Sequence, residues 1–454
     1  MDPPALTSEL SIAPRAFPAT THYWLRHAHV PAALLVDSAP DAPLAQVAHA
    51  AQKTPDGLLR VDLEIRDGAI AQITPAGTLS ADTIPTLDLN GGMVFPCFVD
   101  LHTHLDKGHI WDRNPNPDGT FASALTTVQQ DAEAHWTAAD LYRRMEFGLK
   151  CSYAHGTKAV RTHLDAVGDF FEHSLEVFTA LQAAWRDRLI LQPVCLVTLD
   201  TYFTRAGEQL ADRMAELGGI LGGVAYANPD APAQIERTVA LAQERHLDLD
   251  LHVDETDNPQ SECLRQTAQT LIRQQYSGQA VCGHCCSLAV QPRDRAHETI
   301  RLVQQAKIGI VSLPLCNLFL QDRQPQSTPR WRGVTLLHEL KHAGVPVALS
   351  SDNCRDPFYG YGDHDVLEVL TWSTKIAHLD RPYGEWCRTV TSTPADLMGL
   401  PTVGRIGVGL PADLVVFKAR RYSELFSRSQ RDRWVIRAGQ VIDTTLPDYA
   451  ELDS

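Results

Sequence analysis

The stretch GGMVFPCFVDLHTHLDKGH, from Gly91 to His109, ends an apolar run in two histidines one residue apart. On a β-strand, residues i and i+2 point to the same face. His102 and His104 would therefore stand side by side at the carboxyl end of such a strand. An imidazole pair of this kind is suited to holding a metal ion, so we expect further ligands elsewhere in the chain.

The composition is typical of an ordinary globular protein, since 44% of the 454 residues are apolar and 21% are charged. A formal net charge of −15 argues against a nucleic-acid partner, because phosphate binding needs a basic surface, but it leaves a free small molecule open. No apolar run reaches the roughly 18 residues that a membrane helix needs. Residues 1–20 lack the features of a secretory signal, so we expect a disordered leader and a cytoplasmic protein.

The ten cysteines are predicted to be reduced thiols, because a chain of this length does not need a disulfide framework. Cys282, Cys285 and Cys286 cluster in VCGHCCS, but no second cysteine pair with matching spacing completes a zinc site. Buried structural thiols are the favoured interpretation of this cluster.

Eight β-rich apolar runs alternate with longer amphipathic or Ala-rich runs that are typical of helices. Eight strand–helix units in one sheet are the number that closes a parallel (β/α)₈ barrel. The predicted strands are CFVDLHT (97–103), KAVRTHL (158–164), LILQPVCLVT (189–198), GILGGVAYA (219–227), LDLDLHV (247–253), AVCGHC (280–285), IGIVSL (308–313) and VPVALSSD (345–352).

Both ends of the chain have a different character, with short strands and many Gly and Pro residues. Residues 60–74 read as two strands around the Asp67–Gly68 turn, and short strands recur after about residue 403. We therefore predict an α/β protein with a (β/α)₈ catalytic barrel over 97–400 and a small β-sandwich domain built from both termini, 21–96 and 401–445. The alternative is a pair of unrelated terminal appendages.

Polar side chains recur where the predicted strands end, and in a parallel barrel these ends meet at one mouth. Three imidazoles and a carboxylate would suit one Zn²⁺ or Fe²⁺ ion and leave room for water. A second ion would call for a bridging carboxylated lysine, and Lys158 lies at the wrong end of its strand. The strand-end residues are His102, His104, His163, Asp165, His252, Glu255, His284 and Asp352.

Several ordered blocks resemble the amidohydrolase superfamily, and within it the cytosine deaminase branch, with similarity also to N-isopropylammelide amidohydrolase. The resemblance covers roughly residues 60 to 440. A single HxH is a weak signal, but the ordered set is a strong one. The blocks are HTHLDK, RTHLD, LHVDE, GHCCS, SSDNCRDPF, the loop LPLCNLFLQDRQPQSTPRWRGVTLL and the tail strand GLPADLVVF.

The resemblance implies a role for each residue of the site. Glu255 would protonate a ring nitrogen and then the departing amine, and His284 would orient or polarise the attacking water. Asp352 would accept the proton of that water while bound to the metal. The implied metal ligands are His102, His104, His252 and Asp352.

The residues expected to contact substrate are less uniform. Phe358 falls where the family places an aromatic ring beside the substrate, Gln321 has polar chemistry suited to a heterocycle edge, and His163 offers either contact or support. Two positions depart from the cytosine deaminase pattern: Thr198 replaces a glutamine that reads the pyrimidine, and Asn353 replaces an aspartate. A hydroxyl cannot reproduce a two-point amide contact.

The sequence therefore predicts a metal-dependent hydrolytic deaminase of a free nitrogen heterocycle, with cytosine or a modified cytosine as the first substrate. One alternative is the removal of an amino or alkylamino group from a triazine, a pterin or another aminated base. Another is a ring-opening cyclic amidase, and a third is an inactive barrel used for binding, against which Glu255 argues. The resemblance also implies a homo-oligomer.

Overall fold

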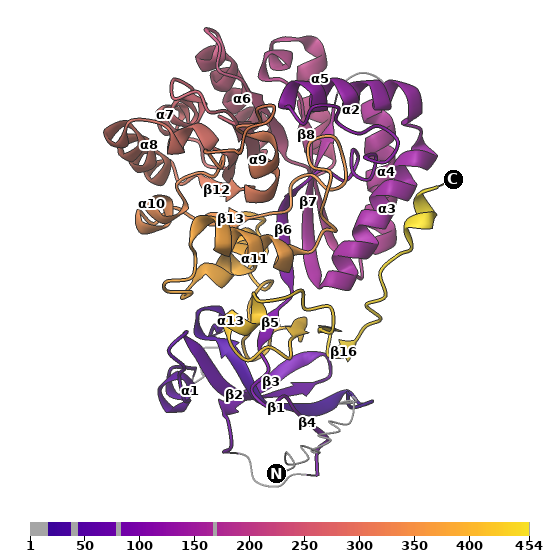
Figure 1. Ribbon diagram of the computed structural model, residues 1–454, viewed down its shortest axis with the longest axis vertical. Coiled ribbons are helices and arrows are strands. Elements are labelled where there is room, and N and C mark those ends of the chain that lie inside the picture. The colour runs from indigo at the N-terminus through magenta and orange to yellow at the C-terminus, as the bar shows by residue number, and fades with distance from the viewer. Residues whose placement is uncertain (1–16, 38–43, 79–82, 167–169, 454) are drawn as a thin grey trace, which may run out of the picture.

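The computed structural model describes residues 17–37, 44–78, 83–166 and 170–453 (Figure 1). Most of the predicted leader, residues 1–16, lies outside them. A large part rich in helices lies above a smaller part rich in strands, and the smaller part contains both the indigo segment near the N-terminus and yellow strands near the C-terminus (Figure 1). The predicted domain boundaries at residues 96/97 and 400/401 remain a prediction.

Eight parallel strands form the centre of the large part, and nearly all of their residues are buried. Burial on both faces explains why these strands read as continuous apolar runs in the sequence. Each of the eight predicted strands overlaps one of them. Their bounds are β6 (Phe98–Thr103), β7 (Thr157–Asp165), β8 (Ile190–Leu196), β9 (Leu221–Ala225), β10 (Leu249–Val253), β11 (Ala280–His284), β12 (Gly309–Ser312) and β13 (Val347–Leu349).

These strands belong to two parallel sheets, one of order β6-β7-β8 and one of order β13-β12-β11-β10-β9. Isolated parallel bridges join Val194 of β8 to Ile220 just before β9, and Thr103 of β6 to Asp352 just after β13. The backbone N–H of Asp352 also donates to the carbonyl of His102 at 2.9 Å. Both edges of the three-stranded sheet are therefore connected to the five-stranded sheet.

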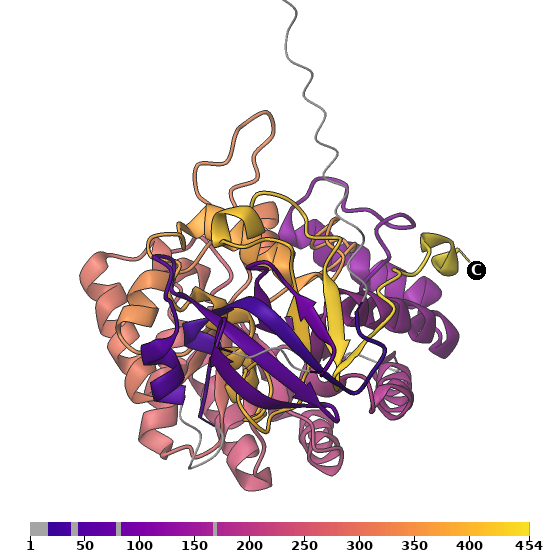
Figure 2. The same ribbon diagram turned by 90° about the horizontal axis from the view of Figure 1, so that it is seen from below.

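Helices follow the strands and pack outside them, as Figure 2 shows from below, with the smaller part in front. Helix α3 is typical: the Thr137 side chain accepts from the backbone N–H of Asp140 at its start, and Gly156 ends it at a φ of 96°. The helices of the large part are α2 (Phe121–His135), α3 (Ala138–His155), α4 (Phe170–Trp185), α5 (Arg205–Glu216), α6 (Ala231–Arg245), α7 (Cys263–Gln274), α8 (Arg293–Gln305), α9 (Pro314–Leu320), α10 (Leu337–His342), α11 (Val366–Ala377) and α12 (Ser392–Leu397), with 3₁₀ turns η2 (Leu199–Phe203), η3 (Cys286–Ala289) and η4 (Trp386–Val390).

The smaller part contains two four-stranded sheets, of order β3-β2-β1-β4 and β16-β15-β14-β5, which share one apolar core. The second sheet pairs β5, from before the large part, with β14, from after it. The bounds are β1 (His22–Pro31), η1 (Ala32–Leu34), α1 (Leu44–Ala50), β2 (Leu58–Arg66), β3 (Ala69–Pro75), β4 (Thr86–Asp88), β5 (Val94–Pro96), β14 (Leu414–Val416), α13 (Tyr422–Leu425), β15 (Trp434–Arg437) and β16 (Gln440–Val441).

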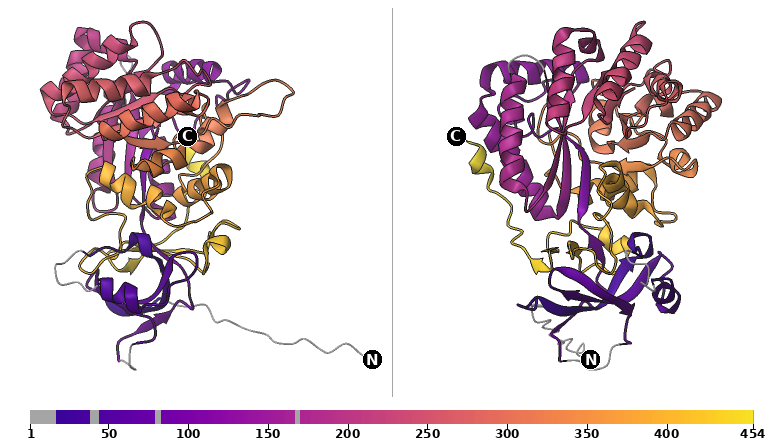
Figure 3. Two further views of the ribbon diagram at one scale, coloured as in Figure 1. Left: turned by 90° about the vertical axis from the view of Figure 1, so that its left-hand side faces the viewer. Right: turned by 180° about the vertical axis from the view of Figure 1, so that it is seen from behind.

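After β16 the chain leaves the smaller part and runs along the outside of the large part (Figure 3). It ends in η5 (Tyr449–Leu452), which packs beside α3, and Lys150 of α3 forms an ion pair with Glu451 at 2.8 Å. All ten cysteines are free and buried. In the part of the chain that the structure describes, no helix is long and apolar enough to cross a bilayer.

Candidate active site

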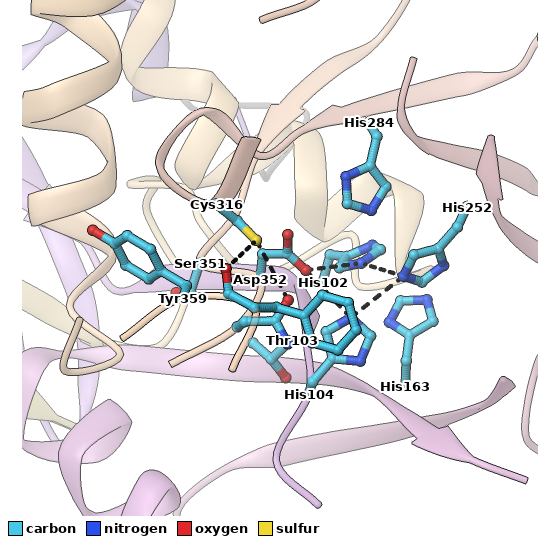
Figure 4. A network of polar contacts seen from close by, with 12 residues as sticks. His102, Thr103, His104, His163, His252, His284, Cys316, Ser351, Asp352 and Tyr359 are labelled. Atoms are coloured by element: carbon cyan, nitrogen blue, oxygen red, sulfur yellow. Dashed lines mark hydrogen bonds and ion pairs between the residues drawn. The ribbon is translucent and has the colours of Figure 1, made fainter. Parts of the chain in front are cut away.

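Three imidazoles and one carboxylate converge at the carboxyl ends of the parallel strands (Figure 4). Nε2 of His252 lies 3.1 Å from Nε2 of His102 and 3.3 Å from Nε2 of His104. Oδ1 of Asp352 lies 3.5 Å and 3.2 Å from the same two nitrogens. The structure thus brings together all four side chains that the sequence predicted as metal ligands.

The spacing of these four atoms fits a single divalent ion. Ligand atoms at about 2.0–2.2 Å from a tetrahedral ion are separated by roughly 3.3–3.6 Å, and the four measured separations lie between 3.1 and 3.5 Å. Burial lowers the pKa of all three histidines well below the usual value, so their nitrogens keep free lone pairs. Burial also raises the pKa of Asp352 to about 7, and a cation beside it would restore its charged form.

The fold places these residues at the carboxyl ends of three strands. His102 lies in β6 and His104 directly follows it, whereas His252 lies in β10. Asp352 comes just after β13 and is held beside β6 by the hydrogen bond to His102 described above. Asp352 adopts a φ of 64° and His284 one of 65°, left-handed conformations that are uncommon for residues other than glycine and that often occur at functional sites.

Glu255 and His284 lie next to the cluster and are joined by Asn317. The Asn317 amide nitrogen is 3.0 Å from Oε1 of Glu255 and 3.0 Å from Nδ1 of His284. Because an amide nitrogen only donates, His284 accepts at Nδ1 and carries its proton on Nε2. That Nε2 has no hydrogen-bond partner among the described residues and is free to donate to a reacting atom.

The two groups are held in the protonation states that proton transfer would require. Burial lowers the pKa of His284 to about 3, so its ring is neutral. Burial, and next the negative charge of Asp352, raise the pKa of Glu255 well above its usual value. Glu255 therefore retains a proton beside the cluster at a pH where an exposed glutamate would have lost it.

A cavity of about 530 Å³ opens over this cluster. His104, His252, Glu255, His284 and Asp352 line one end of it. Helix α2 and its surroundings contribute an apolar wall, and such a largely apolar cavity with a few convergent polar groups is typical of a small-molecule site. The apolar lining includes Phe121, Leu125, Val128, Ala132, Trp136 and Phe170.

Three of the five predicted substrate-binding residues, Thr198, Asn353 and Phe358, line this cavity. His163 is fully buried behind the cluster, with its ring centroid 4.0 Å from that of His102 and its Nε2 3.3 Å from Asp250. Gln321 lies in a loop, where its amide nitrogen is 3.4 Å from the Glu255 carbonyl oxygen. Neither His163 nor Gln321 is among the cavity-lining residues.

Sequence reasoning missed several polar residues of the site. Asn317 lies in the apolar helical segment LPLCNLFL, and the only signal for it was the resemblance of the loop that begins with this segment. Lys107 lines the cavity and its Nζ is 2.8 Å from Oδ1 of Asp165. Asp356 accepts at 2.7 Å from the Asn353 amide, which fixes the orientation of that amide. Lys107 is the last residue of the HTHLDK block and Asp356 lies within the SSDNCRDPF block, so these two blocks were the available signals for them.

Comparison with known proteins agrees with this geometry. Residues 201–443, more than half of the chain, match the model of the Amidohydrolase family. The chain belongs to this family. Amidohydrolases bind a divalent metal, and the buried His and Asp cluster of this amidohydrolase is consistent with that property.

Two relatives of this amidohydrolase are named as a pterin deaminase and an N-isopropylammelide isopropyl amidohydrolase. It is 51% identical to a pterin deaminase of Rhizobium rhizogenes over 88% of its own length and 91% of the relative's. It is 24% identical to the N-isopropylammelide isopropyl amidohydrolase of Pseudomonas sp. strain ADP over 78% and 87% of the two chains.

A solved structure of 5-methylcytosine deaminase from Klebsiella pneumoniae matches this amidohydrolase with a TM-score of 0.77 and 25% identity, over 94% and 98% of the two chains. Together with the relatives, it supports the predicted cytosine deaminase-like branch. This amidohydrolase is therefore a hydrolase that acts on C–N bonds, and its relatives indicate a hydrolytic deaminase of an aminated heterocycle.

Proposed function

We propose that this amidohydrolase is a metal-dependent pterin deaminase, which exchanges the 2-amino group of a pterin for oxygen and releases ammonia. The observation that carries the reaction type is the position of Glu255, which lines the cavity beside the buried His and Asp cluster and is held there by Asn317. The pterin deaminase relative supports the substrate, and therefore favours the pterin alternative over the cytosine that the sequence placed first.

The side chains of the cavity are consistent with this substrate. Thr198 stands where cytosine deaminases carry the glutamine that reads cytosine, and its hydroxyl cannot make the same two-point contact. A cavity of about 530 Å³ has room for a two-ring heterocycle. Phe358 lines the cavity, its ring makes a T-shaped contact with Phe121, and Lys107 Nζ lies over it at 5.3 Å from the ring centroid. We propose that this ring borders the bound heterocycle.

The metal would be held by His102, His104, His252 and Asp352, as one Zn²⁺ or Fe²⁺ ion. When bound, such an ion supplies Lewis acidity and lowers the pKa of a water to about 7. We further propose that the two parallel sheets close as a (β/α)₈ barrel, which would place these ligands at its C-terminal mouth.

The protein residues then move the protons of the hydrolysis. Asp352 accepts one proton from water as the water oxygen bonds to C2 of the pterin. Glu255 donates its proton to the adjacent ring nitrogen, while the Nε2–H of His284 hydrogen-bonds the added oxygen. The added oxygen then gives its remaining proton to Glu255, which passes it to the amino group as the C2–N bond breaks and C2=O forms. The proton held by Asp352 then returns to Glu255, so both carboxyl groups recover their starting states. The overall balance is one water consumed and one ammonia released, with the ring intact.

An ammonia-release assay tests this proposal. The metal-loaded enzyme is given pterin, cytosine, 5-methylcytosine or N-isopropylammelide, and the mass of each product is recorded. We expect kcat/KM for pterin to exceed that for cytosine by about 100-fold or more, with a product in which oxygen has replaced the amino group. Equal or higher kcat/KM with cytosine, or a ring-opened product, would overturn it.

A further inference from the structure

A second cluster of metal-ligating side chains lies outside the cavity. His109, Cys354 and His364 each offer one ligand atom, and these atoms lie within 4.8 Å of one another. None of the three residues lines the cavity over the catalytic cluster. His109 follows β6 in the same loop as His104, and Cys354 lies two residues after Asp352.

The two imidazoles of this cluster are buried without polar partners. His109 exposes 9% of its surface and His364 exposes 2%. Among the described residues, no hydrogen-bond partner lies beside any of their four ring nitrogens. A buried polar group without a partner costs about 1–3 kcal/mol of folding free energy. Two such rings side by side therefore destabilise the fold unless a ligand binds their nitrogens.

The backbone around the cluster adopts left-handed conformations and is joined by hydrogen bonds between two loops. His109 and His364 adopt φ values of 62° and 53°, both left-handed. The His109 N–H donates to the Cys354 carbonyl at 3.1 Å, and the Trp111 N–H donates to the Arg355 carbonyl at 2.8 Å. These bonds keep the loop after β6 against the loop after β13, so two of the three candidate ligands stay together.

We propose that His109, Cys354 and His364 form a second, structural metal site for a borderline divalent cation such as Zn²⁺. Two imidazoles and one thiolate are ligands that such ions prefer, and a water would complete four-fold coordination. Ligand atoms on a tetrahedral zinc ion lie roughly 3.3–3.8 Å apart. The three candidate ligand atoms lie within 4.8 Å of one another, so they would have to move closer together by about 1 Å to bind the ion, for example by rotation of the two imidazole rings.

This site would stabilise the catalytic centre without taking part in the reaction. A bound ion would tie the loop that carries His104 to the loop that carries Asp352, and both residues belong to the catalytic cluster. Binding would release the Cys354 thiol proton, since a thiolate is the ligand form. The inference does not depend on which heterocycle the enzyme deaminates.

Cobalt loading tests the proposal, because in this scheme only the second site has a sulfur ligand. The purified full-length protein is stripped with chelator, reloaded with Co²⁺ and analysed for metal content and absorption. We expect two ions per chain and a near-ultraviolet charge-transfer band from a cobalt–thiolate bond. Absence of the band in the loaded parent protein overturns the proposal, and that result does not depend on the folding of any variant.

Variants assign the band to these residues. Cys354→Ser and His364→Asn should each lose the band and one ion per chain, whereas the matched controls Cys387→Ser and the exposed His297→Asn should keep both. His252→Ala should lose the catalytic ion and the activity but keep the band, which separates this site from the proposed function. A band that persists in folded Cys354→Ser protein, as judged by circular dichroism, also overturns the proposal.

Discussion

Oε1 of Glu255 lies 3.3 Å from Nδ1 of His284, and the Asn317 amide nitrogen lies 3.0 Å from both atoms. One amide thus orients the two groups to which we assign proton transfer and water polarisation. Neither group could turn away from the cluster without breaking a hydrogen bond to Asn317. This arrangement makes Asn317 a positioning residue that can be tested separately from the two groups it holds.

Replacing Asn317 with aspartate or alanine should lower kcat by about 10- to 100-fold, as is usual when the partner of a catalytic group is lost. The Asn317 hydrogen bond stabilises the charged form of Glu255, so its loss should move the limb of the kcat–pH profile that reports Glu255 to higher pH. Asn90→Asp in the smaller part serves as the control. A reduced kcat with an unmoved pH profile would argue against a link to Glu255.

Glu255→Gln should keep the catalytic metal but lower kcat by about 10²- to 10⁴-fold, because the amide cannot transfer a proton. His252→Ala should lose both metal and activity. Metal analysis and ammonia release, measured on the same samples, distinguish the two effects, with exposed Glu244→Gln as the control. Parent-like turnover by Glu255→Gln would end the proton-transfer role.

Phe358→Leu should raise KM for pterin about tenfold with little change in kcat, because it keeps an apolar side chain but removes the aromatic face. Stacking of a heterocyclic base on an aromatic ring contributes about 1–3 kcal/mol. Phe178→Leu in α4, which is buried away from the cavity, controls for general destabilisation. An unchanged KM in Phe358→Leu would contradict stacking of the substrate on Phe358 and indicate that this ring only packs in the cavity wall.

The sequence predicted that the four candidate metal ligands lie together, because they occupy equivalent places at strand ends. Once β6, β10 and β13 are assigned, the parallel geometry alone brings His102, His252 and Asp352 to one side. Burial also made the strands easy to recognise, since each is a continuous apolar run. The short strands of the smaller part were found from their turns, such as the one at Asp67.

The sequence could not predict contacts that depend on how a helix or loop is rotated. Asn317 lies inside an apolar helix, and only the orientation of α9 directs its amide to Glu255. Gln321, four residues later, turns toward a backbone carbonyl instead of the cavity. His163 shares a face of β7 with Asp165, which lines the cavity, but it lies two residues earlier on the strand, so its ring packs against His102 beneath the cavity. The substrate depends on such details, so the sequence predicts a deaminase of an aminated heterocycle more securely than it predicts which heterocycle.

An ion pair between Asp365 and Arg433 should make stability depend on pH. Arg433 Nη1 donates to Asp365 Oδ1 at 2.9 Å, and joins the segment before β15 to the start of α11. Burial alone would raise the pKa of Asp365, but Arg433 and His155 outweigh it and lower the pKa to about 2. A lowered pKa in the folded state adds stability above the unfolded pKa of about 4, and this is lost as pH falls toward 2.

Asp365→Asn should therefore reduce the free energy of unfolding by about 2 kcal/mol or more at pH 7 and flatten its decline between about pH 4 and 2. Urea unfolding at several pH values measures both effects, with exposed Asp187→Asn as the control. A variant that loses stability over this pH range as steeply as the parent would show that Asp365 is not the group responsible.

The most direct test of the catalytic cluster is an anomalous-diffraction map from crystals of the zinc-loaded or iron-loaded protein, recorded at the absorption edge of the metal. We predict a peak about 2.0–2.2 Å from Nε2 of His102, His104 and His252 and from a carboxylate oxygen of Asp352. An active crystal with no peak at that position would contradict the account.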